Sequence, residues 1–132
     1  MIEHKEAREI ISAAVQKAEE IGQPMNIAVM DAGMNLVAFE RMDDAWVLSI
    51  DIAIGKAFTS AGRGLSTRDI GEKAQPGQPL FGVNTTNGGR VVIFPGGLPL
   101  MRDGEVVGAI GVSGGPVDQD EEVAQAGVDA FG

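Results

Sequence analysis

Charged side chains in apolar surroundings are the residues of this chain best suited to chemistry, and Lys56 is the most informative of them. It lies within a predicted helix that is apolar on most sides. A lysine in such a helix extends its amine to solvent along its own methylene stem, pairs with a buried carboxylate, or meets an anionic ligand. Asp51 lies about 140° from Lys56 around that helix, so the two do not pair within it.

A buried amine also has a chemical use. Burial lowers the pKa of a lysine, and the uncharged amine can form a Schiff base with a carbonyl group. In this enzyme hypothesis the substrate is a small carbonyl or carboxylate compound. The catalytic candidates are Lys56, as amine or electrophile, and Asp31 or Asp120, as acid and base.

Two glycine-rich segments could hold a ligand through their backbone. Gly96 and Gly97 lie between two prolines, so they line a pocket in a fixed shape or form a bend between strands. Residues 108–115 precede a predicted helix whose first N–H groups attract anions. The glycines of this second segment equally allow a buried strand to pass close to a helix, and the acidic residues 118–122 would repel a phosphate.

Arg41, at the end of a predicted strand, could clamp a carboxylate through both of its terminal nitrogens or pair with Asp43 or Asp44. The only histidine, His4, falls in the first turn of a helix and is more typical of a solvated side chain than of a metal ligand. With no cysteine either, no metal site is predicted. The ligand-binding hypothesis therefore groups Arg41, Lys56, Gly96, Gly97, Pro99 and Gly114 around one pocket.

Hydrophobic periodicity and turn residues predict the elements that must position these groups. Asp43 or Asp44 is expected to cap the helix that carries Lys56, and Ser66 a short third helix. The apolar back of the Lys56 helix, with Leu48 and Ile52, indicates cover by a neighbouring subunit. Helices are expected from the N-terminal stretch around His4 to residue 21 and near residues 44–61, 66–74 and 116–131. Strands are expected at 25–31, 36–42, 90–94, 98–101 and 105–112. This order favours an antiparallel sheet with helices packed on it.

Length and composition limit the class of protein. The chain of 132 residues suits one domain, 1–132, and 19 glycines indicate many tight turns. Its net charge of −9 argues against nucleic acid and anionic membrane surfaces as partners. The charged N-terminus lacks a signal-peptide core and no stretch is long enough to span a membrane, so the expected location is cytoplasmic.

Several motifs, in the same order and over nearly the whole chain, resemble those of the GlcG/HbpS family. This is the haem-degrading domain family, which includes the C-terminal domain of PduO-type proteins. Many members have Asp-Ala-Gly-Gly-His at the first hairpin, where this chain has Asp31-Ala32-Gly33-Met34-Asn35, so any role of that histidine is lost. The matching segments are residues 28–33, 35–37, 39–43, 49–53, 56–59, 96–100 and 108–114.

The resemblance implies an α+β, profilin-like fold, with a five-stranded antiparallel sheet and helices packed on its faces. It also implies self-association, as dimers built into larger rings or octamers, and haem as a candidate cofactor, for which this chain has only His4. Three hypotheses follow. The chain is a small-ligand or cofactor-binding accessory protein of small-molecule metabolism, an enzyme that uses Lys56, or an assembly protein without a pocket.

Overall fold

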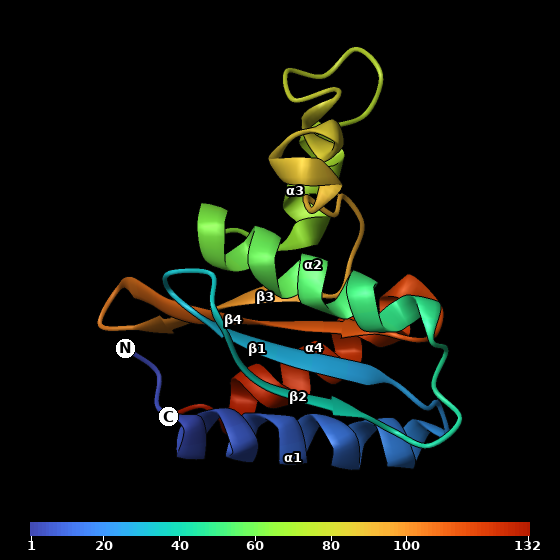
Figure 1. The fold of residues 1–132 in the computed structure, drawn as a ribbon, viewed down its shortest axis with the longest axis vertical. Helices are drawn as coiled ribbons and strands as arrows, with labels where there is room; N and C mark the ends of the chain where they lie inside the picture. The colour runs from blue at the N-terminus through green and yellow to red at the C-terminus, as the bar shows by residue number, and fades with distance from the viewer.

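A four-stranded antiparallel sheet organises the chain, and a computed structural model describes all residues 1–132 (Figure 1). The strands lie in the spatial order β2-β1-β4-β3. The strands and helices are α1 (His4–Ile21), β1 (Asn26–Asp31), β2 (Leu36–Arg41), α2 (Leu48–Arg63), α3 (Thr67–Lys73), β3 (Gly97–Arg102), β4 (Glu105–Ser113) and α4 (Val117–Ala130). Two short 3₁₀ turns, Val83–Thr85 and Asn87–Gly89, lie between α3 and β3.

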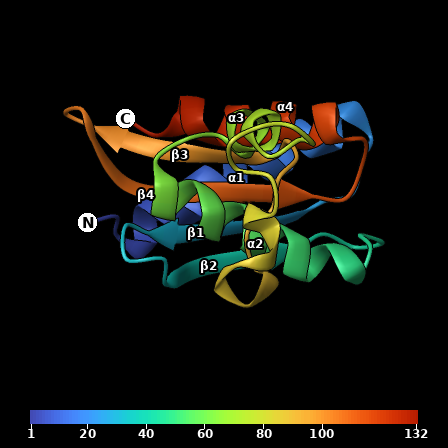
Figure 2. The ribbon, with the colours of Figure 1, turned by 90° about the horizontal axis from the view of Figure 1, so that it is seen from above.

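The helices form a layer on each face of the sheet. Helices α1 and α4 pack against each other and cover one face, and α2 lies across the other (Figures 1 and 2). The main core lies between the sheet and the α1–α4 layer, where Ile10, Ile27, Ile110 and Val123 are fully buried. A smaller core under α2 contains Met30, Ala53 and Phe58. The sequence-based expectation of an antiparallel sheet between helices is confirmed.

The close approach of β4 to α2 depends on glycine. A Cβ atom at Gly111 would lie 2.1 Å from the carbonyl oxygen of Ala53 and 2.5 Å from the nitrogen of Ala57. Both atoms belong to the backbone of α2, so no side chain could be accommodated without moving the helix. This contact places the middle of α2, and with it Lys56, directly against the last strand.

The predicted strand at residues 90–94 is wrong, and the sheet has four strands rather than five. This segment crosses α2 instead of joining the sheet. Its Val92 N–H donates to the hydroxyl oxygen of Thr59 at 2.9 Å, which satisfies a group that a strand would pair with its neighbour. Apolar character alone did not distinguish a strand from an extended segment packed on a helix.

The start of α2 also differs from expectation. The helix begins at Leu48 with Val47 at the N-cap, so neither Asp43 nor Asp44 caps it. Asp44 instead adopts a positive φ of 68° in the preceding turn. Ser66 does cap α3, because its side chain accepts the Asp69 N–H at 3.1 Å. None of the helices combines the length and the hydropathy that crossing a bilayer requires.

Candidate functional site

Lys56 lies on the sheet-facing side of α2 and is completely enclosed by protein, with an exposed fraction of 0%. Its Nζ donates to the Val112 carbonyl oxygen at 2.8 Å and to Asp120 Oδ2 at 2.9 Å. The ring of Phe94 lies 5.1 Å from Nζ and contributes a cation–π contact. Of the three alternatives for Lys56, the structure selects the buried carboxylate, and that carboxylate belongs to the chain itself.

Asp120 reaches Lys56 from the first turn of α4. Its side chain is 2% exposed, and its second oxygen, Oδ1, accepts the Gly115 N–H at 3.0 Å. The glycine-rich approach to the last helix was predicted to cradle an external anion or to serve packing. In the structure its N–H groups face the Asp120 carboxylate, so the anion at this helix start is internal.

The Gly96-Gly97 bend closes over the same ion pair. Gly96 has a φ of +131°, and a Cβ atom there would lie 2.5 Å from Lys56 Nζ. The Gly96 carbonyl accepts the Val112 N–H at 2.9 Å, and the Gly97 N–H donates to the Thr67 hydroxyl at 2.9 Å. These contacts leave no space for a ligand between the bend and the amine.

Burial acts on both partners of the pair. It lowers the pKa of Lys56, although the Asp120 charge and hydrogen bond act to raise it. Burial likewise raises the pKa of Asp120, although the Lys56 charge and the N–H groups of Gly115 and Gly114 act to lower it. Each charge is therefore tolerated in the interior because the other is present.

The other predicted site residues do not gather around Lys56. Arg41 is exposed at the end of β2 and forms no ion pair with Asp43 or Asp44. Asp31 lies in the β1–β2 turn, where its Oδ1 accepts the N–H groups of Gly33 at 2.9 Å and Asn35 at 3.0 Å.

The structure also places the three remaining ligand or metal candidates, Pro99, Gly114 and His4. Pro99 is half-buried on β3. Gly114 is buried, and its carbonyl accepts a hydrogen bond from the Gln23 side chain at 3.0 Å. His4 is exposed at the start of α1.

A hollow of about 300 Å³ is lined in part by Phe94, the same residue whose ring contacts Lys56. We call it the α2 hollow. Eight of its thirteen lining residues are hydrophobic. Its walls are Asp51, Ile52, Gly55 and Phe58 of α2 and the segment 89–94, with Met30, Ile54 and Asn84. Gly55 brings the two walls together, since a Cβ there would lie 2.8 Å from the Val92 side chain.

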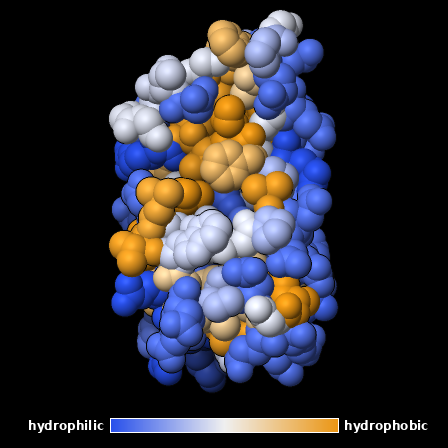
Figure 3. All heavy atoms as spheres, turned by 90° about the vertical axis from the view of Figure 1, so that its right-hand side faces the viewer, coloured by the Kyte–Doolittle hydropathy of each residue, from blue (hydrophilic) through white to orange (hydrophobic).

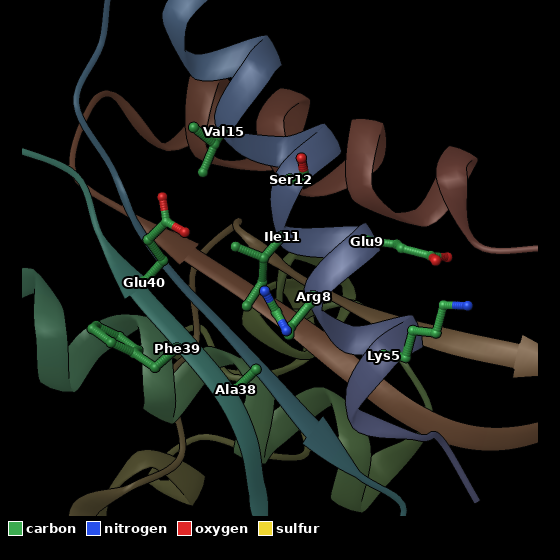
Figure 4. Close-up of a pocket in the computed structure, with 9 residues that line it drawn as sticks. All are labelled: Lys5, Arg8, Glu9, Ile11, Ser12, Val15, Ala38, Phe39 and Glu40. Carbon is green, nitrogen blue, oxygen red and sulfur yellow. The ribbon is translucent and has the colours of Figure 1, made fainter.

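A larger and more charged hollow, about 690 Å³, lies between α1 and β2 (Figure 4). Arg8 extends from α1 toward the strand, whereas Lys5 and Glu9 point outward, away from the groove (Figure 4). Because two cations and two acids line this groove together, it resembles an ordinary polar surface beside an edge strand more than a site built for one ligand.

Sequence reasoning included Phe94 in the loop that could line a pocket, but it missed Arg90 as a residue of the α2 hollow. Arg90 follows Gly88-Gly89 and precedes an apolar run. Because the whole segment was assigned to a strand, Arg90 was not considered as a binding residue. A cation at the start of an apolar segment flanked by glycines was the available signal. Which helix face the segment would meet could not be read from the spacing.

We predict that replacing Lys56→Met destabilises the protein by about 3–5 kcal/mol near neutral pH, because Asp120 is left as a buried unpaired charge. Without Lys56, burial holds the pKa of Asp120 still further above its unfolded value. Protonated Asp120 then stabilises the folded state at low pH. This contribution is lost as the pH rises through the pKa that Asp120 has in the folded state. Urea unfolding of the variant should therefore show a smaller deficit at acidic pH than at neutral pH.

The double variant Lys56→Met, Asp120→Asn is the matched control, since it carries no buried charge. It should recover part of the loss at neutral pH and lack the added pH dependence. A single Lys56→Met variant with wild-type stability across this range would contradict the pairing.

Comparison with known proteins places these features in a family. Residues 2–129 match the family described as haem degrading protein HbpS-like. The chain is 44% identical over 125 residues to an uncharacterised 15.0 kDa protein from the dhaT–dhaS intergenic region of Citrobacter freundii, covering 95% of this chain and 88% of that one.

Two crystal structures are close to this one. The protein ORFY of Klebsiella pneumoniae is 41% identical, with a TM-score of 0.96 over 98% of this chain and 90% of that chain. The structure titled PduOC:Heme Complex is 33% identical, with a TM-score of 0.94 over 98% of this chain and 94% of that chain. The chain therefore belongs to the HbpS-like haem-degrading protein family, as its motifs indicated.

Proposed function

We propose that this chain is a cytoplasmic, oligomeric accessory protein of small-molecule metabolism that binds a small ligand in the α2 hollow. The observation that carries the proposal is the hollow itself, which has mostly apolar walls with a single acid and a single cation among them. Ligand sites typically combine apolar walls with a few polar groups, and 300 Å³ is at the small end of their size range. A relative whose solved structure is a haem complex adds support for ligand binding in this family.

The buried ion pair supports this site without touching the ligand. Phe94 both contacts Lys56 through its ring and lines the hollow. The Gly96-Gly97 bend that follows Phe94 is tied to α3 and β4 by its backbone hydrogen bonds. In this proposal Lys56, Gly96 and Gly97 are positioning residues that hold one wall of the α2 hollow rigid.

Haem is the ligand that the family suggests, and the donor set of this chain does not fit it. Haem iron is held by histidine, cysteine, methionine or tyrosine side chains. The chain has no cysteine and no tyrosine. The structure has four main hollows, with volumes from about 260 to about 690 Å³, and the one histidine lines none of them. Met30 and Met34 line the two smallest of these hollows. Met30 is only 4% exposed, and Met34, which is 38% exposed, is the single such donor in its hollow of about 260 Å³. We therefore propose a ligand smaller than haem.

An enzyme is the second candidate function, and one observation favours it. Lys56 has a lowered pKa and lies 2.9 Å from Asp120, whose pKa is raised. Such a pair could form a Schiff base with a small carbonyl compound and transfer a proton. Against this, both side chains are enclosed, and a substrate would need the Gly96-Gly97 bend to move.

Self-association is the remaining part of the proposal. Trp46, Val47 and Leu48, at the start of α2, are 65%, 70% and 75% exposed. The side of the molecule at which α2 begins carries hydrophobic side chains in its middle and upper part (Figure 3). Apolar groups gathered in this way are typical of protein interfaces, so a second copy of the chain is the proposed cover. The same contact would serve the assembly hypothesis.

Ligand binding in the α2 hollow is tested with Ile52→Glu, which places a charge on the wall of the site. We expect benzoate and benzamide to shift amide NMR signals around the hollow, and the variant to bind both at least about tenfold more weakly. Leu36→Glu is the control, because Leu36 is an exposed apolar residue that lines none of the main hollows. Equal binding by wild type and Ile52→Glu would show that the site lies elsewhere.

In the same titrations haemin should give no saturable Soret band of a ligated iron, because no histidine, cysteine or tyrosine lines the hollows and Met34 is the single accessible methionine there. A sharp one-to-one Soret transition would overturn the inference of a smaller ligand and return haem as the cofactor.

The enzyme hypothesis is tested by borohydride trapping with small aldehydes and ketones, followed by mass mapping of modified lysines. We expect no adduct at Lys56, since its Nζ is fully enclosed and hydrogen-bonded. The exposed lysines Lys5 and Lys73 serve as internal controls for reagent access. Selective modification of Lys56 over these two would favour the enzyme over the binding protein.

Self-association is tested by light scattering coupled to size-exclusion chromatography. We expect the wild type to be larger than a monomer and Leu48→Glu to dissociate into smaller species, because a charge would be buried in the interface. Met101→Glu is the control, since Met101 is 46% exposed near the end of β3, and the β3–β4 hairpin lies at the opposite end of the sheet from the start of α2 (Figure 1). A wild type that remains monomeric at micromolar concentration would contradict this interface.

A further inference from the structure

Arg90 is the only cation that lines the α2 hollow. Its guanidinium carbon lies 4.1 Å from the centroid of the Phe58 ring, and its Nε donates to the Asn87 carbonyl oxygen at 3.0 Å. These two contacts hold the planar group in place from one face and one edge. Its two terminal nitrogens donate no hydrogen bond within the protein and form no ion pair.

Four of the six arginines, Arg8, Arg41, Arg63 and Arg90, form no ion pair within the chain, whereas Arg68 and Arg102 pair with carboxylates. Arg90 differs from the other three because its guanidinium is held over the Phe58 ring while it presents free donors at an apolar hollow. A guanidinium presents parallel N–H donors to a planar carboxylate, which makes it well suited to bind that group through two hydrogen bonds.

We propose that the α2 hollow selects small monocarboxylates with an apolar body, and that Arg90 binds the carboxylate. This inference rests on the proposed function, because it assigns a ligand class to the same hollow. The aliphatic or aromatic body would pack against Ile52, Val92 and Phe94, where its burial contributes in proportion to the apolar area removed from water. The carboxylate would take the free edge of the guanidinium.

Asp51 determines the charge that the site accepts. It lines the same hollow, is exposed and pairs with no cation of the chain. Its negative charge opposes a second anionic group on the ligand, and the acidic surface of the whole chain adds to that repulsion. The site therefore disfavours dicarboxylates and phosphate dianions relative to monocarboxylates.

The experiment compares acids with their neutral amides on the full-length chain. Amide NMR titrations with benzoate against benzamide, and with isovalerate against isovaleramide, should show each acid binding about tenfold or more tightly than its amide. Isophthalate, a dicarboxylate with the same ring, should bind more weakly than benzoate to the wild type.

Variants then assign the charge effects to residues. Arg90→Gln should remove the preference of each acid over its amide while leaving amide binding unchanged, because the apolar walls remain. Asp51→Asn should narrow the difference between isophthalate and benzoate. Arg41→Gln is the matched control, since Arg41 is exposed, has no ion pair and lines none of the main hollows.

The outcomes separate the ligand class from the site. If amides bind as tightly as acids, or if Arg90→Gln leaves the preference for acids intact, the carboxylate assignment is overturned while the hollow stands as a binding site. If no probe binds in either form, the proposed site itself fails and the ligand class fails with it.

Discussion

The buried pair of Lys56 and Asp120 is the interaction on which the rest of the site depends. Two opposite charges lie 2.9 Å apart with essentially no access to water. Such a pair adds little net stability compared with apolar residues, but either partner alone would be costly. Its value here is geometric, because it joins the middle of α2 to the first turn of α4 through the end of β4.

This arrangement changes what the lysine can do. An amine surrounded by a carboxylate, a carbonyl and an aromatic ring has its hydrogen-bonding capacity already used within the fold. In our proposal, recognition of an outside ligand falls to the α2 hollow, where Arg90 is the cation with unused donors. The proposal thus assigns a structural role to one cation and ligand binding to another.

The family gives these features a context without settling the ligand. The fold is shared with a protein solved as a haem complex at 33% sequence identity. The present chain has Met34 and Asn35 at the first hairpin and keeps its one histidine on an exposed helix end. A shared fold does not by itself specify the ligand, because function depends on the site and not on the fold.

The sequence by itself determined most of the architecture. Periodic apolar residues in α1, the Asp103-Gly104 hairpin and the Ser66 cap are local signals, so the antiparallel sheet between helices could be predicted. The motif matches gave the family for the same reason, since they are strings of neighbouring residues. Lys56 could be singled out because a charge in an apolar helix is also visible locally.

Only the tertiary structure decided which groups meet. Asp120 lies 64 residues from Lys56 in sequence, and Val112 lies 56 residues away, so no helical or strand period relates them. The segment 90–94 resembled a strand, but packing against Gly55 and a hydrogen bond to Thr59 placed it on α2 instead. That placement brings Arg90 onto Phe58 and creates the hollow, because long-range contacts depend on how whole elements pack rather than on the residues of any one segment.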